Sequence, residues 1–451
     1  MAVATDKTAL VIGAGIGGLA AAAALAPHFA AIEVLERDRL PEGAAARSGV
    51  PHGSQAHAFF LGAQYALSSL LPGFADDLAA AGAVPVDLGL GGVFDFPGIG
   101  EFPRRDFGLT FYSASRPLIE AVLRRRVAAL ANVRIVEGAR VEALMTSPDG
   151  AAVTGVRHTR PEGGNAERHA DLVIDAAGRN GTLSRAMLAE TGREPLAETR
   201  IGMEIAYTTA IFAKPDAAQP AWQYAYVLAG PPVETRSALI LPIEGGRWLA
   251  TLVGRFGERP PADLAGFLEF ARGLRNQVIY EALKNAVPEG RFTRFIVPGS
   301  AWRHFERLRA PPRGWLPLGD TICDFNPVYG QGMAIAAQEA AMLRRVLDES
   351  AGDLGALPTA FFEALAPIIA AAWSSSVRDL AFPETAGERP ADFGERMRFG
   401  AALTLLALRD AEVHRLWMEV NQLVQPPTIF LAPEFRARLG AVMAEMAAAR
   451  A

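Results

Sequence analysis

The stretch that decides the fold, residues 8–38, reads TALVIGAGIGGLAAAAALAPHFAAIEVLERD. It predicts an apolar strand, a glycine-rich turn, an alanine-rich helix and a second strand that ends at Glu36. Its glycines follow the spacing Gly13-x-Gly15-x-x-Gly18. In such a unit the first glycine makes a tight turn, the second lets the backbone approach a pyrophosphate, and the third lets the helix pack close to the sheet. An acidic residue after the second strand accepts hydrogen bonds from ribose hydroxyls, so the stretch predicts a dinucleotide site.

Composition narrows the class of protein. The chain has 451 residues, enough for two or more subdomains, with 50% hydrophobic and 21% charged residues. A net charge of −5 disfavours a nucleic-acid partner. Cys323 is the only cysteine, which excludes an intrachain disulfide and a cysteine-based metal site, and the seven histidines show no zinc spacing. We expect no metal and a reducing, cytoplasmic location.

Two apolar stretches, residues 9–27 and 357–373, are long enough to resemble membrane spans or a signal segment. The first has glycines that neither role needs, and no basic region precedes it. The second is interrupted by Glu363 and Pro367. We therefore expect no transmembrane segment.

A second stretch, residues 314–340, reads GWLPLGDTICDFNPVYGQGMAIAAQEA. It predicts a strand, a Gly-Asp stop, an irregular loop and a helix, whose first N–H groups attract anionic oxygens and electron-rich rings. A second loop about 300 residues after the first is what FAD, a long dinucleotide, needs at its flavin end. Asp320 would bind a ribitol hydroxyl, and backbone N–H groups around Gly330 to Met333 would stabilise negative charge on a reduced flavin.

The pattern of predicted elements divides the chain into four segments of an α/β fold. Residues 1–185 form the first part of a Rossmann-like FAD-binding domain, with a Gly/Pro-rich excursion at 85–110. Residues 186–295 alternate like antiparallel strands and form a substrate domain. Residues 296–350 complete the FAD-binding domain, and residues 351–451 form a helical region.

The chain resembles the FAD-dependent monooxygenases of the para-hydroxybenzoate hydroxylase-like superfamily, which share the glycine-rich start and a downstream GD…P..GQG motif. Within it the chain is most similar to the bacterial epoxidase-type branch that includes the polyether epoxidases. The segments that carry this resemblance span nearly the whole chain: RSGVPHGSQAH, SRPLIEAVLRRRV, LPIEGGRWLATLVGR, DFNPVYGQGM and EVNQLVQPPTIFL. The resemblance implies a PHBH-like (GR2-type) fold.

The resemblance also implies roles for single residues. Arg116, which opens a predicted helix, would contact FAD, and Val141 would lie against the adenine. The segment from Arg47 to His57 would reach toward the cofactor, with His57 bonded to FAD or substrate or serving as a structural histidine. The full set of expected cofactor-binding residues is Gly13, Ala14, Gly15, Gly17, Gly18, Glu36, Arg37, Arg47, Arg116, Val141, Gly178, Asp320, Pro327, Gly330, Gln331, Gly332 and Met333.

One departure from the superfamily pattern bears on how the flavin is reduced. The usual Asp-Gly pair is linked to FAD and NAD(P)H handling, but the segment here is DAAGRNGTLSR, with Ala177 before Gly178. Asp175 cannot be assumed to take over, and no second GxGxxG offers a stable nicotinamide site. We expect either NAD(P)H as a transient reductant or a partner flavin reductase.

The strands between Thr199 and Phe256 carry aromatic residues and few charges. Their aromatics either line a substrate pocket or form plain core; the candidates are Tyr207, Tyr224 and Tyr226, with Phe212 and Trp222 beside them. Few charges predict an apolar substrate, unless an inward arginine such as Arg236 or Arg247 anchors an acid. Cys323 is expected to be a small packed residue.

The resemblance implies transfer of one oxygen from O2 to an apolar molecule through a C4a-(hydro)peroxyflavin, with epoxidation of a carbon–carbon double bond as the expected reaction. No protein acid, base or nucleophile is legible, so the catalytic residues stay unassigned. Three alternatives remain: a flavin aromatic hydroxylase, an FAD-dependent dehydrogenase or reductase of a prenyl-like or polycyclic substrate, and a non-catalytic FAD-binding protein.

Overall fold

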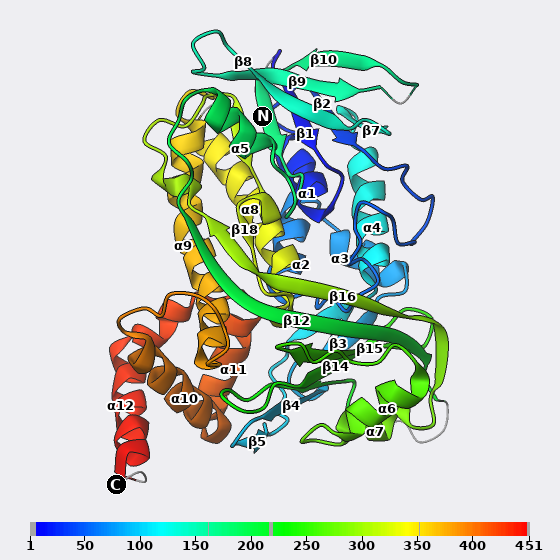
Figure 1. Cartoon of the computed structure of the whole chain (residues 1–451), viewed down its shortest axis with the longest axis vertical. Helices are drawn as coiled ribbons and strands as arrows, with labels where there is room; N and C mark the ends of the chain where they lie inside the picture. Colours follow the sequence, from blue (N-terminus) through cyan, green and yellow to red (C-terminus); the bar gives the residue numbers. More distant parts are fainter. Residues whose placement is uncertain (1–5, 161, 216–219, 351, 449–451) are drawn as a thin grey trace.

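A parallel sheet of five strands organises the part of the molecule that contains the glycine-rich turn (Figure 1). The computed structural model describes residues 6–160, 162–215, 220–350 and 352–448. The strand order is β17-β11-β1-β2-β7, and every neighbouring pair is parallel. The strands are β1 (Thr8–Ile12), β2 (Ala31–Glu36), β7 (Val133–Glu137), β11 (Leu172–Asp175) and β17 (Trp315–Pro317). The predicted Rossmann-like α/β fold is confirmed.

Helix α1 (Ile16–Leu25) lies against this sheet and packs along α8 (Gly332–Glu349) (Figure 1). Residues 18–25 of α1 are all buried, and five of them are consecutive alanines, which take little space between sheet and helix. The other helices of the first 190 residues are α2 (Leu61–Leu70), α3 (Phe74–Ala80), α4 (Arg116–Ala128) and α5 (Leu183–Glu190). A three-stranded antiparallel sheet, β8 (Val141–Thr146), β9 (Val153–Thr159) and β10 (Asn165–His169), connects β7 to β11 in sequence.

A second sheet of eight strands has the order β18-β16-β12-β15-β14-β13-β4-β5. Its strands are β4 (Gly92–Phe96), β5 (Gly100–Glu101), β12 (Glu198–Ala213), β13 (Tyr224–Val227), β14 (Ser237–Ile243), β15 (Arg247–Arg255), β16 (Val287–Arg303) and β18 (Cys323–Asp324). All neighbours are antiparallel except β13 and β4. The excursion at 85–110 thus contributes β4 and β5 to this sheet. The sequence does not indicate these strands, because the segment is rich in glycine and proline. Another short pair, β3 (Val84–Asp87) and β6 (Thr110–Ser113), flanks that excursion.

The long strands β12 and β16 run side by side from the part that contains the parallel sheet to the far end of the second sheet (Figure 1). One face of this sheet is covered by α6 (Leu264–Arg272) and α7 (Val278–Leu283), where Phe212, Trp248 and Phe267 form a compact core. The opposite face presents Tyr207, which packs with Val328 of the loop before α8. The second sheet therefore has one core face and one face turned toward that loop.

The C-terminal region is helical, as predicted: α9 (Leu357–Val377), α10 (Phe393–Arg409), α11 (Ala411–Asn421) and α12 (Pro433–Ala448). Residues 357–381 are long and apolar enough to cross a membrane, with a mean hydropathy of 1.4. This criterion is weak, because buried core helices also meet it. Leu357, Phe361, Leu365 and Ile369 of α9 belong to the main core, so the hydropathy of this helix serves packing.

Candidate functional site

The three segments that follow β1, β11 and β17 meet at one edge of the parallel sheet, where its strands end. Ligands of open α/β sheets bind outside this carboxyl edge. The turn after β1 contains Gly13, with φ of +94°, whose N–H donates to the carbonyl of Leu35 at 2.8 Å. Only glycine adopts this backbone conformation without strain. The predicted strand–turn–helix unit therefore forms at the edge where a ligand can reach it.

The glycines of this turn differ in what a side chain would meet. A Cβ atom at Gly18 would lie 1.9 Å from the carbonyl oxygen of Gly13, so close packing of α1 excludes any other residue there. A Cβ atom at Gly15 would meet no atom within 4 Å. No side chain caps the N-terminus of α1 at Gly15. Open space thus lies in front of unpaired N–H groups, as an anion site requires.

Glu36 ends β2 beside this turn, and its side chain is buried. Its carboxylate accepts hydrogen bonds from the N–H groups of Ala14, at 2.8 Å, and Asp38, at 2.9 Å. One guanidinium nitrogen of Arg47 lies 3.2 Å from it. A carboxylate offers about four lone-pair positions, so one remains for a ribose hydroxyl. Arg37, by contrast, is exposed and directed toward the carbonyl of Gly49 at 3.4 Å.

Arg47 and Arg116 share a buried carboxylate. Arg47 lies 2.7 Å from Glu120 and 2.9 Å from Asp38, and Arg116 lies 2.7 Å from the other oxygen of Glu120. Burial alone would raise the pKa of Glu120, but the two guanidinium groups hold that pKa below its ordinary value. The two arginines thus stand together beside the first turn, held by carboxylates.

Val141 is the first residue of β8 and comes close to the same place. The N–H of Ala139 donates to the carbonyl of Glu36 at 2.8 Å, and that of Gly138 to the carbonyl of Asp38 at 3.1 Å. Val141 is half-buried just beyond this contact. Its position is compatible with the expected neighbour of an adenine ring.

The loop before α8 reaches this region although about 300 residues separate the two in sequence. A Cβ atom at Gly17 of α1 would lie 3.0 Å from Leu318 and 3.5 Å from Ala336 of α8. One at Gly332, the first residue of α8, would meet only Asp320, at 3.9 Å. The fold therefore brings together the glycine-rich turn, Asp320 and the start of α8.

The remaining residues predicted in this loop flank the helix start. Gly330 has φ of +68°, and a Cβ atom there would lie 3.0 Å from the ring of Phe60. Pro327 is exposed and Met333 is buried. Gln331 donates to the hydroxyl of Ser375 at 3.1 Å, while its buried carbonyl oxygen has no partner among the described residues.

Two carboxyl groups, half-buried Asp320 and buried Asp324, lie next to each other under this loop. Burial raises the pKa of Asp320, against the positive charges of Arg179, Arg116 and Arg303. Burial, together with the charge of Asp320, raises the pKa of Asp324 to about 7, although Arg179 lies 2.5 Å from it. Near neutral pH the Asp320–Asp324 pair is therefore partly protonated.

The segment that departs from the superfamily pattern passes behind the first turn. Asp175 is fully buried and accepts hydrogen bonds from the hydroxyl of Ser184, at 2.5 Å, and from the N–H of Ala177, at 3.1 Å. Its carboxyl group points into the core and does not replace the missing aspartate. Gly178, with φ of +82°, has open space around it.

His57 and His52 lie on the segment that packs against the loop before α8. Their rings are 5.4 Å apart, and the Nδ1–H of His57 donates to the carbonyl of Gln55 at 2.8 Å. Burial lowers the pKa of His57 well below its usual value, and the charge of Arg116 adds to this. Burial likewise lowers the pKa of His52 to about 4. Both rings are neutral at physiological pH.

The predicted pocket tyrosines separate in the structure. Tyr207 and Tyr226 reach the loop before α8: the hydroxyl of Tyr226 donates to the carbonyl of Val328 at 2.8 Å, and that of Tyr207 lies 3.5 Å from the side-chain oxygen of Asn326. Tyr224 instead donates to the carbonyl of Leu88 at 2.7 Å.

Tyr224 is packed by aromatic rings in a separate core cluster. Phe212 and Trp222 belong to the α6–α7 side of the sheet. These aromatics are structural, and only Tyr207 and Tyr226 turn toward the candidate site.

The two arginines considered as inward anchors also face elsewhere. Arg236 pairs with Glu258 at 2.5 Å and lies over the ring of Phe270 in α6. Arg247 pairs with Glu244 at 3.5 Å. The arginine that does share the face of Tyr207 is Arg255, which the sequence did not single out. Its strand position follows only from the register of β15.

A further group was also not visible in sequence. Asp379, in the turn after α9, accepts hydrogen bonds from Asn326, at 2.7 Å, and from the hydroxyl of Tyr329, at 3.0 Å. Burial raises the pKa of Asp379, and these two donors oppose the rise. Asp379 lies 50 residues beyond the loop that it holds, and no local motif marks it.

Cys323, in contrast, is a packed residue as predicted, because burial raises its pKa and it belongs to the main core.

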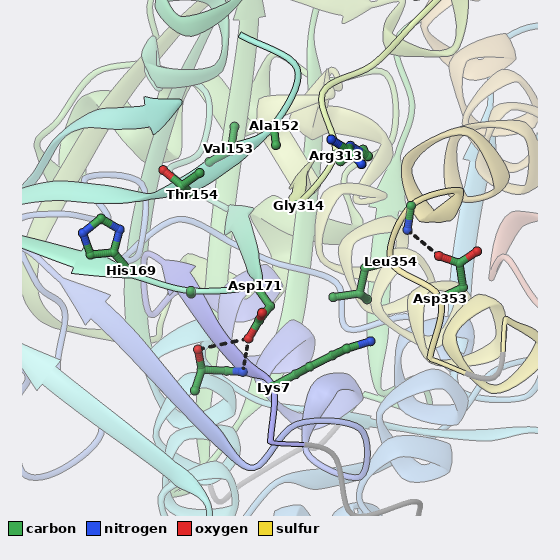
Figure 2. Close-up of a pocket in the computed structure, with 13 residues that line it drawn as sticks. Lys7, Ala152, Val153, Thr154, His169, Asp171, Arg313, Gly314, Asp353 and Leu354 are labelled. Atoms are coloured by element: carbon green, nitrogen blue, oxygen red, sulfur yellow. Dashed lines mark hydrogen bonds between the residues drawn. The ribbon is translucent and has the colours of Figure 1, made fainter. Parts of the chain in front are cut away.

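A surface cavity of about 660 Å³ lies away from the candidate site (Figure 2). It lies at the opposite edge of the parallel sheet, where β1, β11 and β17 begin, and it is lined by Lys7, His169, Asp171, Arg313 and Asp353, among others. The carboxylate of Asp171 there accepts from the N–H of Thr8 at 2.7 Å. A second, apolar groove of about 460 Å³ lies between α8, α9 and residues 423–427.

Comparison with known proteins gives three kinds of similarity. Residues 11–76 match a family described as an NAD(P)-binding Rossmann-like domain. The chain is 35% identical over 354 residues to Protein Rv3254 of Mycobacterium tuberculosis, which covers 75% of this chain and 72% of that protein.

Solved structures share the fold at low sequence identity. The myxobacterial chondrochloren halogenase CndH, an FAD-dependent halogenase, is 18% identical, covers 97% of this chain and 96% of its own, and has a TM-score of 0.62. PqsL, a probable FAD-dependent monooxygenase from Pseudomonas aeruginosa, is 18% identical, covers 90% and 98%, and has a TM-score of 0.57. The chain therefore has a fold that flavin-dependent halogenases and monooxygenases also have.

Proposed function

We propose that the protein, which belongs to the same family as Protein Rv3254 of Mycobacterium tuberculosis, is an FAD-dependent monooxygenase. The observation that carries this proposal is the meeting of the glycine-rich turn with Asp320 and the start of α8. A short dinucleotide site needs only the turn and Glu36. The second loop supports a longer cofactor whose far end is an electron-rich ring.

The residues present fit FAD. The open space at Gly15 suits the pyrophosphate, and the remaining lone pair of Glu36 suits a ribose hydroxyl. Asp320 faces the start of α8, where a ribityl chain would pass. The N–H groups of Gly332 and Met333 at the helix start, together with the helix dipole, would stabilise negative charge on the flavin.

When bound, FAD supplies the chemistry that reduces O2 and transfers one oxygen atom. The chain's own part is to hold the substrate, fix its orientation and exclude water. Tyr207 and Tyr226 form one wall of this site. Apolar side chains pack beside Tyr207, with Ile205, Val253 and Val297 in the same buried cluster. Such walls support an apolar substrate body.

We further propose that the oxygen is added to a carbon–carbon double bond of this substrate. The apolar wall and the resemblance to epoxidases support this reaction. Aromatic hydroxylation is the second candidate, because the buried Asp379–Tyr329 pair offers a carboxylate near the same loop. The absence of the usual aspartate at Ala177 supports reduction by transient NAD(P)H or by a partner reductase. The single cysteine supports a cytoplasmic location.

The test has two arms. First, the purified protein is examined for non-covalent FAD, reduced without oxygen and mixed with O2 or with an artificial electron acceptor. Fast oxidation by O2 supports a monooxygenase, and oxidation only by the acceptor supports the dehydrogenase alternative. Second, labelled O2 is supplied with matched alkene and phenol substrates. One labelled oxygen in an epoxide or its diol supports epoxidation, whereas label in the phenol ring alone refutes it.

A further inference from the structure

We infer that Arg255 is a substrate anchor that binds a carboxylate, so that the substrate joins an apolar body to one acidic end. This inference deepens the proposed function and rests on it, because it takes the loop-facing side of the second sheet as the substrate wall. It also answers which inward arginine, if any, could hold an acid.

The strand register places Arg255 on that wall. Arg255 ends β15 opposite Ile205 of β12, and Val253 stands opposite Tyr207. Side chains two residues apart share one face of a strand, so Arg255 shares the face of Val253. Burial raises the pKa of Tyr207 and Tyr226, and the charge of Arg255 opposes the rise at both. The guanidinium group is therefore near both tyrosines of the site.

Arg255 is buried, with 3% of its surface exposed, yet it forms no ion pair with a carboxylate among the described residues. Its Nη1 donates to the carbonyl of Thr235 at 2.9 Å and lies 3.5 Å from the hydroxyl of Ser237. Its Nε has no hydrogen-bond partner among the described residues. The ring of Phe382 lies 5.4 Å away.

Other buried arginines of this chain are paired. Arg47 and Arg116 contact Glu120 at 2.7 Å each, and Arg303 lies 3.4 Å from Glu198. A buried charge without a counter-ion is unfavourable for folding, so an unpaired buried guanidinium is a candidate for binding an anionic ligand. Among the buried arginines of the described chain, Arg255 thus differs in forming no ion pair with a carboxylate.

The surroundings favour a single carboxylate over a phosphate. A guanidinium binds a carboxylate through two parallel N–H groups, and the hydroxyl of Tyr207 has only a long contact of 3.5 Å to give up. Asp379 also lies close enough for the charge of Arg255 to act on its pKa, although burial is the larger influence. In its ionised form Asp379 would repel a dianion more strongly than a monoanion.

The test compares Arg255→Met with Arg236→Met, the same change at an arginine that precedes β14 and packs on Phe270 of α6. Flavin-free and FAD-loaded proteins are titrated calorimetrically with trans-cinnamate and with cinnamyl alcohol, which share an apolar alkene body but differ in charge. We expect wild type and Arg236→Met to prefer cinnamate, and Arg255→Met to lose this preference, roughly 30-fold in affinity. Without ligand, the Tm of Arg255→Met should stay within about 3 °C of wild type.

Three outcomes would overturn the inference. They are the absence of a preference for cinnamate in wild type, a preserved preference in Arg255→Met, and a fall of roughly 8 °C or more in the Tm of Arg255→Met, as expected for a structural arginine. FAD content is measured on each protein. If wild type does not bind FAD, the proposed function is refuted. The cinnamate comparison in the flavin-free protein still decides whether Arg255 binds a carboxylate.

Discussion

Valine at Gly15 and alanine at Gly18 should separate cofactor binding from folding. A Cβ atom at Gly15 meets nothing within 4 Å, and its φ of −77° and ψ of −177° are open to any residue. Gly15→Val should therefore cost the flavin-free protein only about 1 kcal/mol, from the poorer N-cap. At Gly18 the added atom lies 1.9 Å from a backbone oxygen, so Gly18→Ala should cost about 3 kcal/mol or more.

The effect on FAD runs the other way for Gly15. The methyl groups of the valine would occupy the space proposed for the pyrophosphate. The clash should cost about 2–3 kcal/mol of binding free energy, which weakens FAD binding roughly 30- to 150-fold. Thermal unfolding of flavin-free proteins measures the first quantity, and quenching of FAD fluorescence measures the second. Wild-type FAD affinity in Gly15→Val would refute the placement of the pyrophosphate. Normal stability of Gly18→Ala would refute the packing argument for α1.

Three further predictions concern groups around the two sheets. Burial raises the pKa of Glu339 to about 8, so the free energy of unfolding should fall as the pH rises from 4.5 to 8, by up to about 1.4 kcal/mol per pH unit. Glu339→Gln should flatten this fall in thermal scans, and an unchanged pH profile in the variant would contradict the prediction. Tyr224→Phe should lower the free energy of unfolding by about 1 kcal/mol, because the carbonyl of Leu88 loses its donor. Tyr207→Phe should leave the denaturant midpoint nearly unchanged and raise the KM for substrate. An equal loss of stability in both variants would contradict the assignment of Tyr224 to the core and Tyr207 to the site. Asp320→Ala should weaken FAD about tenfold in a fluorescence titration, and no loss would remove Asp320 from the site.

The sequence predicted the local units of the fold well, because their causes are local. The spacing of Gly13, Gly15 and Gly18 after an apolar run requires one turn geometry, and the structure has it. The C-terminal helices follow from their periodicity. The strands β4 and β5 were missed, because glycine and proline dominate their segment and their pairing with β13 comes from a distant part of the chain.

The residues predicted for the proposed cofactor end lie together in the structure, whereas those predicted for the proposed substrate end separate. Cofactor motifs are contiguous, so each can be recognised alone. The positions of Arg255 and Asp379 depend instead on which strand face and which loop they meet, and a shift of one residue in register would reverse the face. For the same reason Tyr224 appeared equivalent to Tyr226, although their hydroxyl groups bind different parts of the chain.

The central claim is that two distant stretches form one site for FAD, and a calorimetric comparison tests it most directly. Flavin-free protein is titrated with FAD, with ADP and with NAD⁺ under the same conditions. ADP can use only the half of the site at Gly15 and Glu36, whereas FAD also uses Asp320 and the start of α8. We predict one FAD per chain, bound at least about 100-fold more tightly than ADP or NAD⁺. FAD binding no tighter than that of ADP would contradict the account.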